Sequence, residues 1–247
     1  DKNFMPISFA ALINQANDQW RSHTLTGLTE IVTVHLFIIS PLGEDYFLIK
    51  PINVILMVML AAGLLVLARS IISASLLLLF LFLLVTAFVI EIHGGGGMVT
   101  IRIRAGAWIL MALAIMWIVA RTVYAPGQIT YHRVVGASML YLTIGVLFAA
   151  LYAFVATLTP EAFRGLSISP HVSLPTDVVY FSFVTLTTVG YGDVTPLDPL
   201  IRSLSNLESI IGQLYPATVL ARLVSLEERF GGGAKKGSVR QSPDSGH

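Results

Sequence analysis

A seven-residue segment near the end of the chain has the composition of a cation site built from main-chain oxygens. It reads Thr187-Thr188-Val189-Gly190-Tyr191-Gly192-Asp193. A dehydrated cation needs oxygen ligands on all sides, and backbone carbonyls supply them when successive carbonyls point to one side. Such a run needs dihedrals that alternate in hand, and Gly190 and Gly192 adopt positive φ at little steric cost. We therefore predict that this segment binds a dehydrated cation, with the Thr188 hydroxyl as an additional ligand.

The other side chains of the segment are expected to support this site. The side chains of Val189 and Tyr191 should point away from the ion and pack against their surroundings. This packing would fix the diameter of the ring of oxygens around the ion. One chain supplies one strand, whereas a cage around the ion needs four. A single copy of the segment per chain therefore predicts a homotetramer around a fourfold axis.

The composition indicates which kind of element must position the segment. The 247 residues are 55% hydrophobic and only 12% charged, which excludes an ordinary soluble domain and a disordered chain. A net charge of +1 gives no reason to expect a nucleic-acid partner. The absence of cysteine excludes disulfides and thiolate metal sites. We therefore expect an all-α protein that crosses a lipid bilayer several times.

Six stretches are candidate transmembrane helices, because a helix crosses the bilayer in about 20 apolar residues. They are residues 28–42, 51–68, 71–92, 105–123, 134–158 and 200–224. The first is short enough to be interfacial or re-entrant instead. Six spans with the N-terminus inside place most of the 15 Lys and Arg residues in the cytoplasm. This predicts a plasma-membrane protein with both termini cytoplasmic, although Arg102 and Arg104 run against the pattern.

The stretch between the last two spans is too polar and too broken to cross the bilayer itself. Pro175 suits a first helical turn, and Asp177 lies near the positive end of the helix dipole. A short helix is expected to about Thr187, followed by the glycine-containing loop. Non-helical backbone at membrane depth is tolerated only where it is buried or lines a watery path. We therefore predict a re-entrant helix and loop.

The segment and its place between two spans resemble the selectivity filter of pore-loop potassium channels. The resemblance covers about residues 134–225 and is closest to small bacterial ion-channel proteins. It implies a tetrameric pore that binds K⁺ and uses no cofactor and no catalytic residue. The implied K⁺ ligands are Thr188, Val189, Gly190 and Tyr191, supported by Thr187, Gly192 and Asp193.

With this resemblance the chain is expected to divide into four parts. Residues 1–26 show amphipathic spacing and should lie at the membrane surface, or else be frayed. Residues 27–124 hold four peripheral spans. Residues 125–226 form the pore domain, with an outer helix, a pore helix, the filter and an inner helix. Residues 227–247 are rich in Gly, Ser and Lys and are predicted to be disordered.

One position departs from the family pattern. In the resembled channels the acid at the end of the filter is tied to the short helix, often to a tryptophan thirteen residues earlier. Here the acid is Asp193 and that position is Tyr180. The Tyr180 phenol could donate to Asp193, or Tyr180 could simply be a packed aromatic residue.

The last span carries three candidate gating residues. Gly212 has the same offset from Asp193 as the hinge glycine of many relatives, and Pro216 obstructs the carbonyl four residues earlier. The predicted bend at Gly212 and Pro216 could open the pore or be a static kink. Glu208 is a carboxylate inside a membrane helix and therefore a functional candidate. It could bond to the short helix or face the cavity.

Other functions fit the sequence less well. A potassium uptake transporter would carry four degenerate filters in one chain, and a less selective cation channel would have an altered Gly190-Tyr191-Gly192. An enzyme is not expected, because Glu91 and His93 are the only catalytic-looking pair. The span at 105–123 has no arginine ladder, which predicts weak or no voltage dependence.

Overall fold

The structure is a computed structural model that describes the helical body of the chain. The described residues are 27, 31, 58, 60–62, 64–65, 70–93, 97–123, 131–159, 161–166 and 176–238. The predicted surface helix at 1–26 and the span at 28–42 lie outside these residues, apart from Ile31. The span at 51–68 lies largely outside them.

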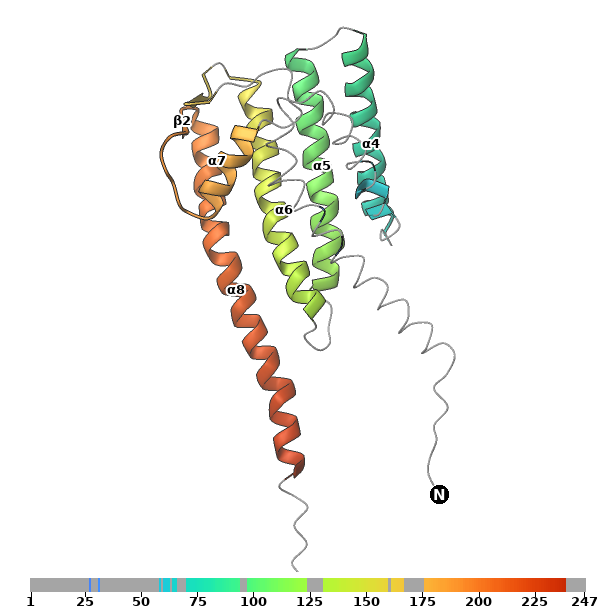
Figure 1. The fold of residues 1–247 in the computed structure, drawn as a ribbon, viewed down its shortest axis with the longest axis vertical. Helices are drawn as coiled ribbons and strands as arrows, with labels where there is room; N and C mark the ends of the chain where they lie inside the picture. The colour runs from blue at the N-terminus through green and yellow to red at the C-terminus, as the bar shows by residue number, and fades with distance from the viewer. Residues whose placement is uncertain are drawn as a thin grey trace, which may run out of the picture.

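Three long apolar helices stand side by side in the body of the molecule (Figure 1). They are α4 (Ile71–Ile92), α5 (Met98–Val123) and α6 (Tyr131–Ala156). Among the described residues, these three are long and apolar enough to cross a membrane. The chain is therefore a mostly helical membrane protein, while the total of six spans stays a prediction.

Each of these helices packs mainly on the next one in the chain. A buried cluster that includes Leu77, Phe80, Met111, Ile118 and Met139 joins α4, α5 and α6. The Ser70 hydroxyl accepts a hydrogen bond from the Ser73 amide at 3.2 Å, which caps the first turn of α4.

The start of α5 differs from the prediction. The span was expected to begin at residue 105, whereas α5 begins at Met98 and so includes Arg102 and Arg104. Arg102 donates from Nε to Thr157 Oγ1 at 3.1 Å and from Nη2 to the Thr157 carbonyl at 2.7 Å. Thr157 directly follows α6, so Arg102 satisfies a carbonyl that the helix end leaves open. This contact with Thr157 gives a structural reason for the position of Arg102 on the predicted outer side.

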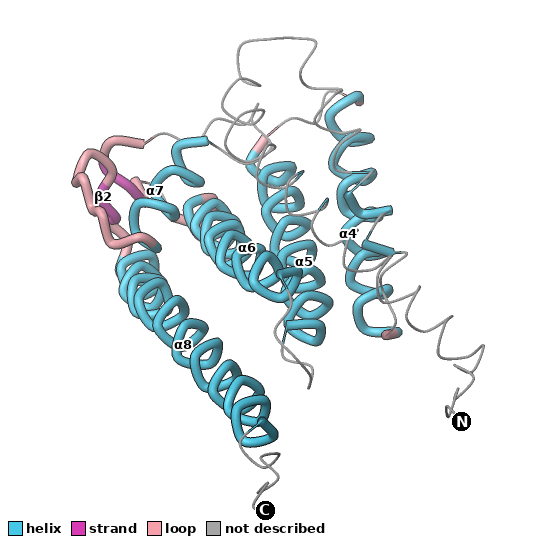
Figure 2. Tube along the Cα trace, turned by 60° about the horizontal axis from the view of Figure 1, so that its bottom comes forward, coloured by secondary structure: helices cyan, strands magenta, loops and turns pink. Residues whose placement is uncertain are grey.

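The C-terminal half adds a short helix and a long one. Helix α7 (Thr176–Leu186) lies beside α6 and α8 (Pro199–Ser238), at the end of the molecule that carries β1 (Phe163–Arg164) and β2 (Thr195–Pro196). Figure 2 shows α8 as the longest rod, extending past the ends of its neighbours. The two strands pair antiparallel, with Phe163 opposite Pro196.

Helix α8 begins at a clear cap and ends later than predicted. Asp198 Oδ1 accepts hydrogen bonds from the amides of Leu200 at 2.8 Å and Ile201 at 3.2 Å, and Pro199 occupies the first helical position. The helix runs to Ser238, so the predicted boundary of a disordered tail at 227 falls inside it. Residues 226–229 are good helix formers that extend an existing helix, and the glycines that follow do not end it.

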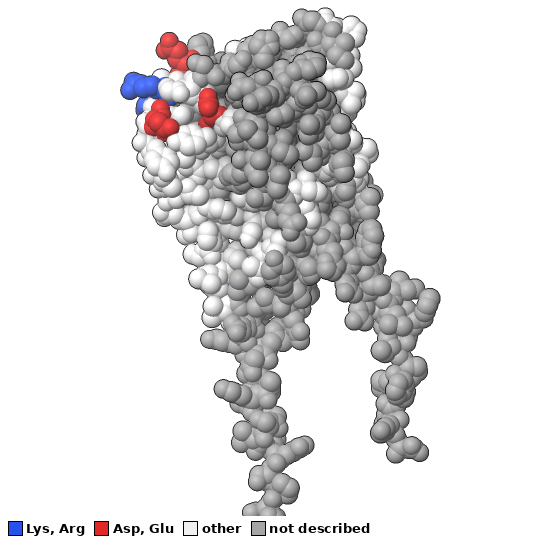
Figure 3. All heavy atoms as spheres, viewed as in Figure 1, with Lys and Arg blue, Asp and Glu red and all other residues white. Residues whose placement is uncertain are grey.

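Charged side chains are unevenly spread over the surface. On the face shown in Figure 3 they gather at the end that carries β2, and the described surface below is uncharged. Large apolar side chains of α4 are exposed along this body, among them Leu78, Phe82 and Phe88. This distribution suits a membrane location, with the β1–β2 end at one boundary of the bilayer.

Candidate functional site

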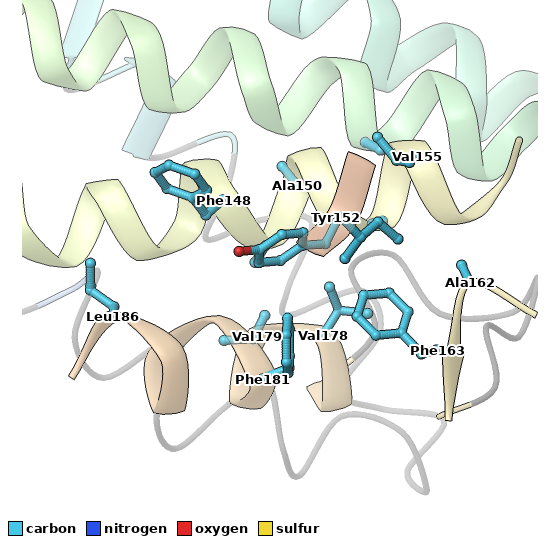
Figure 4. Close-up of a cluster of buried hydrophobic side chains, with 14 of the residues drawn as sticks. Phe148, Ala150, Tyr152, Val155, Ala162, Phe163, Val178, Val179, Phe181 and Leu186 are labelled. Atoms are coloured by element: carbon cyan, nitrogen blue, oxygen red, sulfur yellow. The ribbon is translucent and has the colours of Figure 1, made fainter. Parts of the chain in front are cut away.

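Helix α7 is held against α6 and α8 by its apolar face. Val178, Val179, Phe181 and Leu186 are buried there, together with Ser182. The ring of Tyr152 from α6 meets Phe181 edge to face, with centroids 5.2 Å apart. Figure 4 shows Tyr152 lying between α6 and the labelled side chains of α7. This packing fixes the C-terminal end of α7, from which residues 187–193 continue.

The backbone of residues 187–193 alternates in hand, as the sequence predicts. The φ angles are +58° at Thr188, +57° at Gly190 and +82° at Gly192. Positive φ is inexpensive for the two glycines but uncommon for a threonine. Thr188 was not expected in this conformation, although a strict alternation places it there. The amides of Thr188 and Val189 donate back into α7, to Thr185 and Val184, each at 2.9 Å.

The outward side chains of this segment have few neighbours within one chain. Val189 is 52% exposed and Tyr191 is 73% exposed. The expectation that they pack outward is therefore not met by contacts inside a single copy. Other surfaces must cover them if they are to fix the position of the backbone.

Tyr180 and Asp193 form the hydrogen bond that the spacing suggested. The Tyr180 hydroxyl donates to Asp193 Oδ2 at 2.8 Å. This bond lowers the pKa of Asp193 below its usual value and raises the pKa of Tyr180. Both groups are exposed, so solvent weakens the interaction. The bond ties the far end of the segment back to α7.

A close backbone contact holds the turn that follows Asp193. Gly165 has a φ of +84°, and a Cβ at this position would overlap the carbonyl oxygen of Asp193. The Ala162 carbonyl accepts from the Leu197 amide at 2.9 Å. Sequence reasoning missed Gly165, because its partner is brought near only by the pairing of β1 and β2.

Glu208 faces α7 and α6, so the structure favours the bonding role over the cavity role. It is 0% exposed. Its Oε2 accepts from the Tyr152 hydroxyl at 2.6 Å, and its Oε1 lies 2.5 Å from Ser182 Oγ. Tyr152 carried no signal in the sequence, while Ser182 was visible only as a polar residue in an apolar helix.

Gly212 touches α7 directly. A Cβ built at Gly212 would overlap the carbonyl oxygen of Leu186, the last residue of α7. The absence of a side chain here is therefore required by packing. Pro216 lies inside α8, which continues through it. The bend predicted at these two residues stays a prediction.

Comparison with known proteins covers this half of the chain. A family model described as "Ion channel" matches residues 137–229, which contain most of α6 and all of α7. The chain is also similar to Protein LctB of Bacillus caldotenax, 35% identical over 34% of this chain and 64% of that protein. Protein LctB of Geobacillus stearothermophilus is 38% identical over 24% of this chain and 42% of its own length. The chain thus spans less than two thirds of either relative. No solved structure shows a significant match to it.

Proposed function

We propose that the chain forms a potassium-selective channel of the pore-loop type, because residues 137–229 match a family model described as "Ion channel". Four copies surround one axis, and each contributes residues 188–191 to a single K⁺ path. Carbonyl oxygens, with the Thr188 hydroxyl, replace the water around the ion. The ion moves down its gradient, so no cofactor and no catalytic residue takes part.

The observation that carries this proposal is the alternating backbone of the segment. Positive φ at Thr188, Gly190 and Gly192 is the pattern by which a short strand turns successive carbonyls to one side. A carboxylate site would bind divalent cations, whereas carbonyl oxygens suit a large monovalent ion that must also leave. The proposed ion ligands thus lie mainly in the main chain.

The exposure of Val189 and Tyr191 supports the assembly of four copies. In a ring, the outward side chains of one strand are covered by neighbouring short helices. A single chain leaves both side chains open to solvent. We expect the tetramer to bury them, which holds the carbonyls at the spacing that K⁺ requires.

The rest of the chain places this pore in a membrane. Helix α6 serves as the outer helix, α7 as the re-entrant pore helix and α8 as the inner helix. We propose a plasma-membrane protein of six spans with both termini in the cytoplasm. This orientation would place most of the Lys and Arg residues on the cytoplasmic side, which supports it. The apolar centre of α5, between Arg104 and Arg121, supports weak or no voltage dependence.

Flux measurements on purified protein test the proposal. Liposomes that contain only this protein should release K⁺ much faster than Na⁺, and Ba²⁺ should block the release. Gly190→Ala forces a side chain onto a positive φ and should abolish selective flux. Gly106→Ala is the matched control, because a Cβ there meets no atom within 4 Å. Equal K⁺ and Na⁺ flux through the wild type would refute potassium selectivity.

A further inference from the structure

A buried carboxyl group joins the three helices of the C-terminal half. Glu208 on α8 lies against Tyr152 on α6 and Ser182 on α7. The Ser182 hydroxyl has a second close neighbour, since its Oγ lies 2.7 Å from the carbonyl oxygen of Gly145 on α6. Four groups are therefore linked by three short oxygen–oxygen contacts.

The number of protons in this network decides the charge of Glu208. Each of the three contacts needs one proton between its two oxygens. The Tyr152 hydroxyl supplies one and the Ser182 hydroxyl supplies one, while the Gly145 carbonyl can only accept. An ionised Glu208 would leave two acceptors facing each other without a proton. The network is complete only when Glu208 itself carries the third.

The direction of each bond follows from this count. Tyr152 donates to Oε2 of Glu208, and Ser182 donates to the Gly145 carbonyl at 2.7 Å. Oε1 of Glu208 then carries the proton and donates to Ser182 Oγ at 2.5 Å. Each of the three contacts then has one proton between its two oxygens.

Among the described residues, the side chains that hydrogen-bond to Glu208 include no cation. Its two bonding side chains, Tyr152 and Ser182, are neutral. From α6, Tyr141 also interacts with it electrostatically. The titratable side chains of α7, Asp177 and Tyr180, are exposed, and so is Arg202 on α8. A carboxylate enclosed in this way without a cation is strongly disfavoured, which agrees with the proton count.

We propose that Glu208 is a neutral carboxylic acid and acts as the positioning residue that holds α7 in place behind residues 187–193. The inference rests on the proposed channel function. Glu208 lies one helical turn before Gly212, where α8 meets the Leu186 carbonyl directly. Its bonds therefore fix the helix from which the ion-binding segment extends. It is not assigned as a K⁺ ligand, because its side chain is buried and both of its oxygens bond Tyr152 and Ser182.

This assignment gives conduction a defined pH dependence. Loss of the Glu208 proton removes the bond to Ser182 and places a charge in an apolar site. The network is intact while Glu208 holds its proton, and it is lost once the pH is high enough to remove that proton. Potassium flux should therefore fall on the alkaline side.

A glutamine at this position separates proton binding from geometry. In Glu208→Gln the amide NH₂ can donate to Ser182 Oγ, and the amide oxygen can accept from Tyr152. This variant keeps the three contacts but cannot titrate. We expect wild-type flux at neutral pH and no alkaline loss. Glu161→Gln, at an exposed loop position, is the matched control and should keep the wild-type pH profile.

Infrared spectroscopy provides a readout that does not depend on conduction. A protonated carboxylic acid has a carbonyl band that ionised Asp and Glu lack. Wild-type protein at neutral pH should show this band, and Glu208→Gln should lose it. Potassium flux without the band, or an alkaline loss that persists in Glu208→Gln, would overturn the assignment. An intact band without potassium flux would count against the channel function instead.

Discussion

At the scale of single residues, Tyr180 and Asp193 form a bond whose strength depends on pH. The Tyr180 hydroxyl lowers the pKa of Asp193, so the carboxyl stays ionised to lower pH in the folded protein. The stabilisation is present above the ordinary pKa of an aspartate and is lost as the pH falls through the lowered value. The segment between the two residues is therefore held least firmly in acid.

Tyr180→Phe tests this bond. Without the hydroxyl, the pKa of Asp193 should rise toward its ordinary value. Residues 187–193 should also be held less firmly, so the current should inactivate faster. Because the bond is then absent at every pH, the acid-side fall in steady current that comes from breaking it should disappear. Macroscopic currents recorded over a pH series measure both effects. Identical inactivation and an identical acid limb in Tyr180→Phe would show that Tyr180 only packs.

The sequence revealed this pair but not the partners of Glu208, and the reason is distance along the chain. Residues 187–193 form a contiguous string, and Tyr180 lies on the helix that immediately precedes it. Tyr152 is 56 residues from Glu208 and Ser182 is 26 residues from it. Which apolar faces of α6, α7 and α8 meet is decided by tertiary packing, which no local spacing specifies.

At the scale of the elements, the contact between α7 and α8 gives Gly212 a role that helix physics alone does not supply. The offset from Asp193 suggested a hinge, because glycine weakens a helix. The structure shows that the α7 backbone occupies the place of a side chain at this position. A substitution here thus changes packing before it changes flexibility.

Gly212→Ala should therefore lower the folding stability of the protein, and not only the open probability of the proposed channel. Overpacking of this kind costs about 1–3 kcal/mol. Thermal unfolding in detergent should show a lower midpoint, while Gly106→Ala on α5 should stay near the wild type because its Cβ meets no atom within 4 Å. Wild-type stability combined with a fall in open probability would instead support the hinge.

Arg102 connects the peripheral helices to the end of α6. Its two hydrogen bonds reach the hydroxyl and the carbonyl of one residue, Thr157. Arg102→Lys keeps the charge but loses the paired geometry of the guanidinium. Because the site is partly exposed, we expect a loss of about 1 kcal/mol of unfolding free energy. Thermal unfolding of Arg102→Lys measures it, and an unchanged midpoint would show that the contact is incidental.

At the scale of the whole molecule, the proposed ion path needs three further copies of the chain. Native mass spectrometry of the purified protein should give four copies per particle. If wild-type and Gly190→Ala chains are expressed in equal amounts, roughly one particle in sixteen contains four wild-type copies. Potassium flux per particle should fall accordingly. A fall to only half would show that each chain conducts independently.

The length of α8 has a consequence for how the protein can be controlled. At about 1.5 Å per residue, its 40 residues extend roughly 60 Å, twice the hydrocarbon thickness of a bilayer. A continuous helix of this length can transmit motion along its axis. It contacts α7 at Gly212, which packs against the backbone of Leu186. We expect a displacement of the C-terminal part of α8 to be passed along the helix to the contact between Gly212 and Leu186, which directly precedes the proposed ion-binding segment.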